Sequence, residues 1–65
     1  MTYWFEIVGE DSDLCGEEFL VEFPNGTTKV EAIEYVKYRL FPNEKVKCYG
    51  KVSDEEAEMM GLDTY

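Results

Sequence analysis

The stretch TKVEAIEYVKYRLFP at residues 28–42 carries the strongest structural signal in the sequence. Thr28 and Glu31 have the spacing of a capping box, in which a hydroxyl and a carboxylate accept hydrogen bonds from backbone N–H groups at a helix start. Apolar residues then recur at helical spacing and predict one apolar face; these residues are Val30, Ile33, Val36, Leu40 and Phe41. Because Pro42 disfavours helical geometry in the residue before it, the helix should end at Phe41 or one residue earlier.

A first strand is predicted at residues 2–8, which are rich in aromatic and β-branched side chains. Side chains alternate between the two faces of a strand, and the carboxylate of Glu6 should face water. The outward set is then Thr2, Trp4, Glu6 and Val8, and the inward set is Tyr3, Phe5 and Ile7.

A second strand is predicted at residues 18–23, where the sequence EFLVEF alternates more cleanly. Its inward set is Phe19, Val21 and Phe23, and its outward set is Glu18, Leu20 and Glu22. Pro24 ends the strand because its nitrogen has no hydrogen to donate to a neighbouring strand. The polar connection GEDSDLCGE at residues 9–17 then joins the two strands as an antiparallel hairpin.

A third strand is predicted at residues 45–52, which read KVKCYGKV. Alternation places Val46, Cys48, Gly50 and Val52 on one face and Lys45, Lys47, Tyr49 and Lys51 on the other. A second capping box, formed by Ser53 and Glu56, predicts a short helix over residues 54–60. Gly61 suits the position that follows a helix end.

These elements predict a single α+β domain over residues 1–65 with the order ββαβα. A right-handed crossover from the second strand through the main helix makes the third strand parallel to the second. The simplest sheet has the order 2-1-3, with the main helix packed on one face and a short C-terminal helix. Either that terminal helix or a second copy of the chain, in a homodimer, could cover the open face.

Composition excludes several classes of protein. Two cysteines, Cys15 and Cys48, are too few for a disulfide scaffold. No apolar stretch approaches the roughly 20 residues of a membrane span, and the N-terminus lacks a signal-peptide pattern. We therefore expect a soluble cytoplasmic protein with reduced thiols and no membrane partner.

The absence of histidine removes the commonest general base and the commonest metal ligand. We therefore predict no catalytic residues, no metal and no cofactor. An enzyme built on paired carboxylates is disfavoured because a chain of 65 residues can hardly enclose a cleft.

One segment approaches a calcium-binding pattern. Asp11, Asp13, Gly16 and Glu22 stand at positions 1, 3, 6 and 12 of a loop of the EF-hand type. Cys15 occupies position 5, where an oxygen ligand is needed, and the flanking segments read as strands rather than helices. The sequence therefore predicts an acidic hairpin loop without a specific calcium site.

Charge is distributed in three blocks along the chain. Residues 1–28 hold seven acids and no base, residues 29–51 hold six bases and three acids, and residues 52–65 hold five acids and no base. Such asymmetry suggests an interaction module that binds a basic protein surface, and in its sharpest form an inhibitor or nucleic-acid mimic. The candidate binding residues form two acidic patches, one in residues 10–22 and one in the helix at residues 54–58; they are Glu10, Asp11, Asp13, Glu17, Glu18, Asp54, Glu55 and Glu58. An acidic surface that only keeps the protein soluble would have the same composition.

An alternative hypothesis concerns the outward face of the sheet. Trp4 and Tyr49 would lie there beside the lysines 45, 47 and 51, which combines aromatic stacking with positive charge as in modules that bind single-stranded nucleic acid; the candidate set is Trp4, Lys45, Lys47, Tyr49 and Lys51. Acidic residues on the same face and a net charge of -9 make nucleic acid an unfavourable partner.

Overall fold

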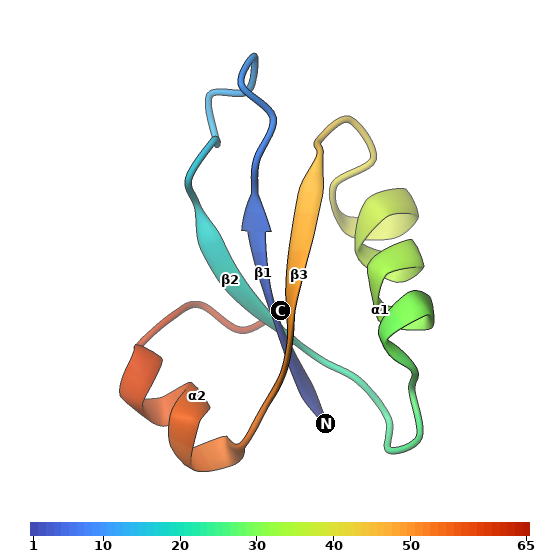
Figure 1. Ribbon diagram of the computed structural model, residues 1–65, viewed down its shortest axis with the longest axis vertical. Coiled ribbons are helices and arrows are strands. Elements are labelled where there is room, and N and C mark those ends of the chain that lie inside the picture. The colour runs from blue at the N-terminus through green and yellow to red at the C-terminus, as the bar shows by residue number, and fades with distance from the viewer.

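The computed structural model describes residues 1–65 as a three-stranded sheet with a helix on one side (Figure 1). The strands are β1 (Thr2–Ile7), β2 (Glu18–Glu22) and β3 (Val46–Val52), in the order β2-β1-β3. β1 is antiparallel to both neighbours, so β2 and β3 are parallel to each other. The predicted α+β class, sheet order and strand directions are therefore confirmed, although each predicted strand is one residue longer than the observed one.

Three helical segments complete the domain. They are α1 (Lys29–Tyr35), the π-helical turn η1 (Val36–Leu40) that continues it, and α2 (Asp54–Met60). Both predicted capping boxes are present: the N–H of Glu31 donates to Thr28 Oγ1 over 3.2 Å, and the N–H of Glu56 donates to Ser53 Oγ over 3.1 Å. Gly61 ends α2 in the left-handed conformation, at φ 64°. No helix of the protein has the length and apolar character needed to cross a membrane.

The hydrophobic core lies between the sheet and α1. The residues buried there are Tyr3, Phe5, Ile7, Phe19, Val21, Ala32 and Val36. Burying each large side chain of this set contributes about 1.5 to 3 kcal/mol of transfer free energy. The inward sets predicted for β1 and β2 are confirmed, with Phe23 half-buried against the same cluster.

The buried face of α1 differs from the predicted one at Val30. Val30 is 64% exposed, whereas Ala32 is fully buried. Ala32 and Val36 are one helical turn apart and face the sheet together, and Val30 lies roughly 200° around the helix from Ala32. Because the side chain of Ala32 is small, the helix backbone can approach the sheet closely at this point. The pattern of large apolar residues in the sequence did not reveal this contact.

The last turn of the main helix is a π turn rather than the α turn that the sequence predicts. The N–H of Phe41 donates to the carbonyl of Val36, five residues earlier, over 2.9 Å. This spacing places Phe41 on the same side as Val36, and its ring lies 4.9 Å from that of Phe19. Phe41 leaves the helical region at φ -132°, directly before Pro42 as predicted.

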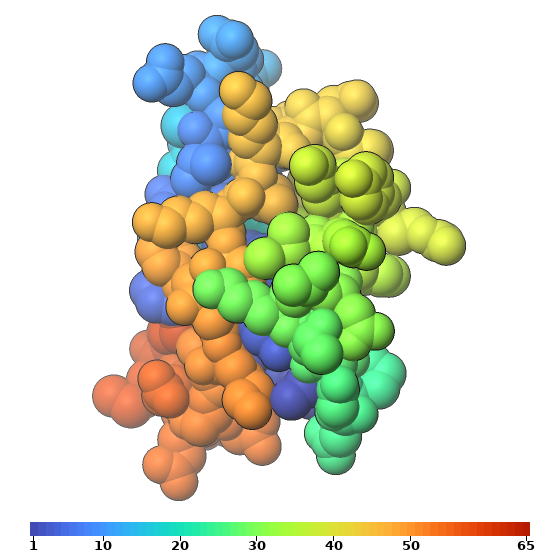
Figure 2. Space-filling model, turned by 45° about the vertical axis from the view of Figure 1, so that its right-hand side comes forward, coloured from blue at the N-terminus to red at the C-terminus, as the bar shows by residue number.

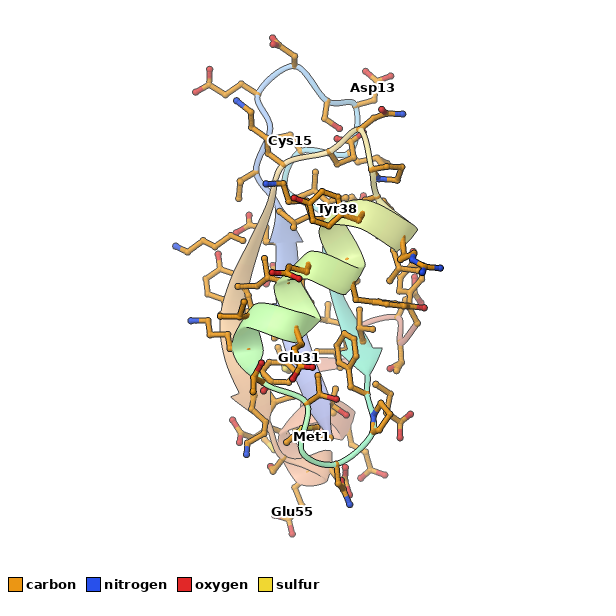
Figure 3. The ribbon with its side chains drawn as sticks, turned by 90° about the vertical axis from the view of Figure 1, so that its right-hand side faces the viewer. Met1, Asp13, Cys15, Glu31, Tyr38 and Glu55 are labelled. Carbon is orange, nitrogen blue, oxygen red and sulfur yellow. The ribbon has the colours of Figure 1, made fainter.

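The second face of the sheet, opposite α1, is partly closed by the C-terminal segment. Leu20 and Thr2, both predicted on the outward face, are only 1% and 7% exposed. Residues 63–65 run beside β2: the N–H of Leu20 donates to the carbonyl of Asp63, and the N–H of Tyr65 donates to the carbonyl of Leu20, each over 2.8 Å. Figure 3 shows α2 behind the lower end of the sheet, with α1 in front. The faces of Thr2 and Leu20 were predicted correctly, and the cover of this face, which the sequence left open, comes from the C-terminal end of the same chain.

A β-bulge in β3 overturns the predicted alternation of that strand. Cys48 pairs with Phe5 and Gly50 pairs with Trp4, so Tyr49 is an extra residue between them. From Gly50 onward the faces exchange, and Gly50 (φ 124°) and Val52 share the second face instead of the core face. Lys51, opposite Tyr3, therefore lies on the other face from Lys47.

Candidate functional site

The three charge blocks of the sequence become two acidic ends and a base-bearing middle of the folded molecule. All six bases belong to α1, η1, β3 and the turn between them, together with three acids. The other twelve acids belong to the β1–β2 hairpin and the segment after β3, which carry no base. Because residues 63–65 bond to β2, these two acidic segments adjoin each other. In Figure 2 the base-bearing segments occupy the middle of the visible surface, between the hairpin loop at one end and α2 at the other.

The first acidic surface is the tip of the hairpin, formed by Glu10, Asp11, Asp13 and Glu17, all exposed. Local hydrogen bonds order this loop: the N–H of Leu14 donates to Ser12 Oγ over 3.0 Å, and the N–H of Gly16 donates to the carbonyl of Ile7 over 2.8 Å. Gly16 has φ 94°, which permits the return into β2. We call these four acids the tip surface.

The second acidic surface lies on α2 and consists of Asp54, Glu55 and Glu58, all exposed. Glu56 is separate because its carboxylate closes the capping box. Asp13 and Glu55 lie at opposite ends of the molecule in Figure 3, and the longest extent of the chain is 32 Å. The acids predicted in two patches, at residues 10–22 and 54–58, therefore lie on two separate surfaces, the tip surface and the α2 surface.

Glu18, the remaining acid of these two patches, belongs to a third group on the second face. The rings of Trp4 and Tyr49 stack with centroids 4.3 Å apart. Trp4 Nε1 donates to Glu18 Oε1 over 3.0 Å, and the Tyr49 hydroxyl donates to Glu6. Lys47 Nζ lies 4.9 Å from the centre of the Tyr49 ring. We call these five residues the Trp4–Tyr49 cluster.

Electrostatics in this cluster favour the neutral phenol. The hydrogen bond to Glu6, reinforced by burial and by the charges of Glu6 and Glu18, raises the pKa of Tyr49 above its usual value. The bulge explains why the cluster forms, because it inserts Tyr49 beside Trp4 and leaves a glycine opposite the indole. The sequence placed the two rings on one face but did not reveal their carboxylate partners; Trp4 and Glu6, two residues apart on one strand, were the available signal.

The lysines of the alternative hypothesis do not form one stripe. Lys47 is in the cluster, Lys51 lies on the other face, and Lys45 precedes β3 and lines a polar hollow beside Gly9 and Glu10 of the hairpin loop. The two aromatic side chains are hydrogen-bonded to carboxylates, and carboxylates repel phosphates. This arrangement is unfavourable for single-stranded nucleic acid.

The residues of the calcium-like pattern do not converge. Asp11 and Asp13 are at the hairpin tip, whereas Glu22 pairs with Thr2 at the far end of β2. No group of three or more aspartate, glutamate or cysteine side chains is placed to hold a metal ion.

No protein-family model, curated protein or solved structure matches this chain. Its function is therefore inferred from its own surface.

Proposed function

We propose that this protein is a non-enzymatic interaction module that binds a basic surface on a partner protein. The observation that supports the proposal is the separation of charge between segments of the chain: twelve acids without a base on the hairpin and the C-terminal segment, and all six bases on the segments between them. A solubilising surface needs net charge but does not need this separation.

The tip surface and the α2 surface would act mainly by steering association. Exposed charges interact over the Debye length of about 8 Å at physiological salt, and they raise association rates with oppositely charged surfaces. In its sharpest form the proposal makes the protein an inhibitor that mimics nucleic acid, with carboxylates in place of phosphates against a nucleic-acid-binding partner. The cytoplasm is the proposed compartment, because Cys15 and Cys48 are both free thiols.

Charge reversal tests the proposal and locates the binding surface. One variant carries Asp11→Lys, Asp13→Lys and Glu17→Lys, and the other carries Asp54→Lys, Glu55→Lys and Glu58→Lys. Basic proteins captured from an extract of the source cell are identified, and binding of each purified partner is then measured at several salt concentrations. We expect one triple variant to abolish salt-sensitive binding while circular dichroism stays unchanged.

A double variant on the base-bearing segments, Glu34→Lys with Glu44→Lys, controls for the change in net charge, and because it reverses two acids instead of three, its effect is compared per reversed charge. If neither triple variant weakens binding more than this control, the acidity serves only solubility. Binding of labelled single-stranded DNA that is lost on Trp4→Ala would instead support the nucleic-acid hypothesis.

A further inference from the structure

A row of charges crosses the second face of the sheet beside the stacked rings. Glu18 pairs with Glu6, and Glu6 pairs with Lys47, so the three residues lie side by side on β2, β1 and β3. Like charges directly opposite each other destabilise an antiparallel pair. Each of the two glutamates accepts a hydrogen bond from a ring of the Trp4–Tyr49 cluster through one oxygen, and the other oxygen carries none. The row has two negative charges and one positive charge, so one further cation would neutralise its net charge.

The ring of Tyr49 already attracts a cation from within the chain. Lys47 Nζ lies 4.9 Å from the ring centre, inside the distance of about 6 Å at which cation–π attraction operates. Tyr49 is 42% exposed, so a group from outside can reach it. Two aromatic rings and two free carboxylate oxygens therefore lie together on an accessible face.

We propose that the Trp4–Tyr49 cluster is the point at which the basic partner inserts an arginine side chain; this inference rests on the proposed function and names the contact that it uses. A guanidinium is planar, stacks on an aromatic ring and donates to carboxylates with two N–H groups at once. The ammonium of a lysine donates from a single point and cannot stack in this way. The cluster therefore distinguishes arginine from lysine, which the tip and α2 surfaces, as simple arrays of charge, do not.

Lys47 competes with the incoming side chain in this arrangement. Its ammonium lies over the Tyr49 ring, so binding of arginine to that ring requires it to move aside. Removing the charge of Lys47 should strengthen binding, and removing the charge of Lys51 on the opposite face should do so much less. The two variants have the same net charge, so their difference isolates the position.

Trp4 is the only tryptophan in the chain, so its fluorescence reports directly on the site. The purified protein is titrated with a hexa-arginine amide, with a hexa-lysine amide and with a labelled single-stranded oligonucleotide, and total binding is followed in parallel by calorimetry. We expect saturable quenching or a shift of Trp4 emission by hexa-arginine, about fivefold tighter than any effect of hexa-lysine.

Two charge-matched pairs test the location. Glu18→Gln keeps an acceptor for Trp4 but removes the charge, and should weaken hexa-arginine about fivefold; Glu58→Gln on α2 removes the same charge and should have less effect. Lys47→Gln should strengthen binding more than Lys51→Gln. Equal effects within each pair, or calorimetric binding without a change in Trp4 emission, would overturn the inference and leave the proposed acidic module intact.

The remaining outcomes separate the inference from the proposed function. Failure of hexa-arginine to bind overturns the arginine site alone, because the partner assay with the triple variants is independent of it. Selective binding at Trp4 together with unchanged partner binding in both triple variants would retain the arginine site and overturn the role of the tip and α2 surfaces. Quenching by the oligonucleotide instead of the peptide would overturn the arginine site in favour of nucleic acid.

Discussion

The two faces of the sheet are covered in different ways. The α1 face is closed by one continuous helical segment and buries a cluster of seven residues. The second face buries only Leu20 and Thr2, beneath the C-terminal segment, and leaves the Trp4–Tyr49 cluster accessible. The face that carries most of the apolar burial thus has little surface left for recognition, whereas the partly covered face has aromatic rings and charges available.

Phe5 should show the largest effect, because it is the fully buried centre of the α1 face. Phe5→Ala should lower the free energy of unfolding by about 3 to 5 kcal/mol, much of the stability of a small domain. Val30→Ala is the control on α1 and should change it by about 0.5 kcal/mol or less. Urea unfolding followed by circular dichroism measures both. A large loss at Val30 would mean that the helix packs through the face the sequence predicted.

Leu20 tests whether the second face is closed where the structure closes it. Leu20→Ala should lower the free energy of unfolding by about 2 to 4 kcal/mol, as expected for a buried leucine. Val8→Ala, at a position 39% exposed, should cost about 0.5 kcal/mol. Equal, small losses in urea unfolding would show that the C-terminal segment does not close this face over Leu20 in solution.

Gly50 sharpens the comparison at the bulge. Its φ of 124° is a conformation that side chains rarely adopt, so Gly50→Ala should cost about 1 to 3 kcal/mol in thermal unfolding. Gly9→Ala is the control, since an added Cβ there meets Lys45 Cβ at an ordinary 3.6 Å. A stabilising effect of Gly50→Ala would indicate that β3 has no bulge and that Lys47 and Lys51 lie on the same face, as the sequence predicted.

The smallest expected effect is the titration of Tyr49. The raised pKa means that the folded state favours the protonated phenol. The resulting stabilisation is fully present below the pKa of an unfolded tyrosine, about 10, and is lost as pH rises through the higher folded value. Phenolate absorbance should therefore show one tyrosine that ionises late, absent in Tyr49→Phe. If the titration curves of the parent chain and of Tyr49→Phe differ by one tyrosine with an ordinary pKa, the hydrogen bond to Glu6 is ruled out.

The parts of the fold that the sequence predicted are those set by local spacing. Capping residues and Pro42 located the helices, and alternation located the inward sets of β1 and β2, because these depend on neighbours within a few positions. The burial of Leu20 depends on residues more than forty positions away, and no local pattern encodes it.

The candidate site was predicted less well for a related reason. The acids and the aromatic rings were named correctly, but one extra residue at Tyr49 reversed the faces of everything after it. That reversal removed Lys51 from the face of Lys47. The hydrogen bonds of Trp4 and Tyr49 depend on side-chain geometry across strands, which strand parity alone does not specify.

The bulge also opposes edge-to-edge aggregation of the sheet with other copies of the chain. A sheet edge with unpaired N–H and carbonyl groups is a template for adding further strands. The edge at β2 is occupied by the backbone of residues 63–65, so β3 is the edge left for such growth. There the extra residue at Tyr49 breaks the regular spacing of backbone groups, and lysines on both sides of it repel a second copy of the same strand. The segment that disturbs the predicted lysine face thus limits aggregation of a chain whose strands are rich in aromatic residues.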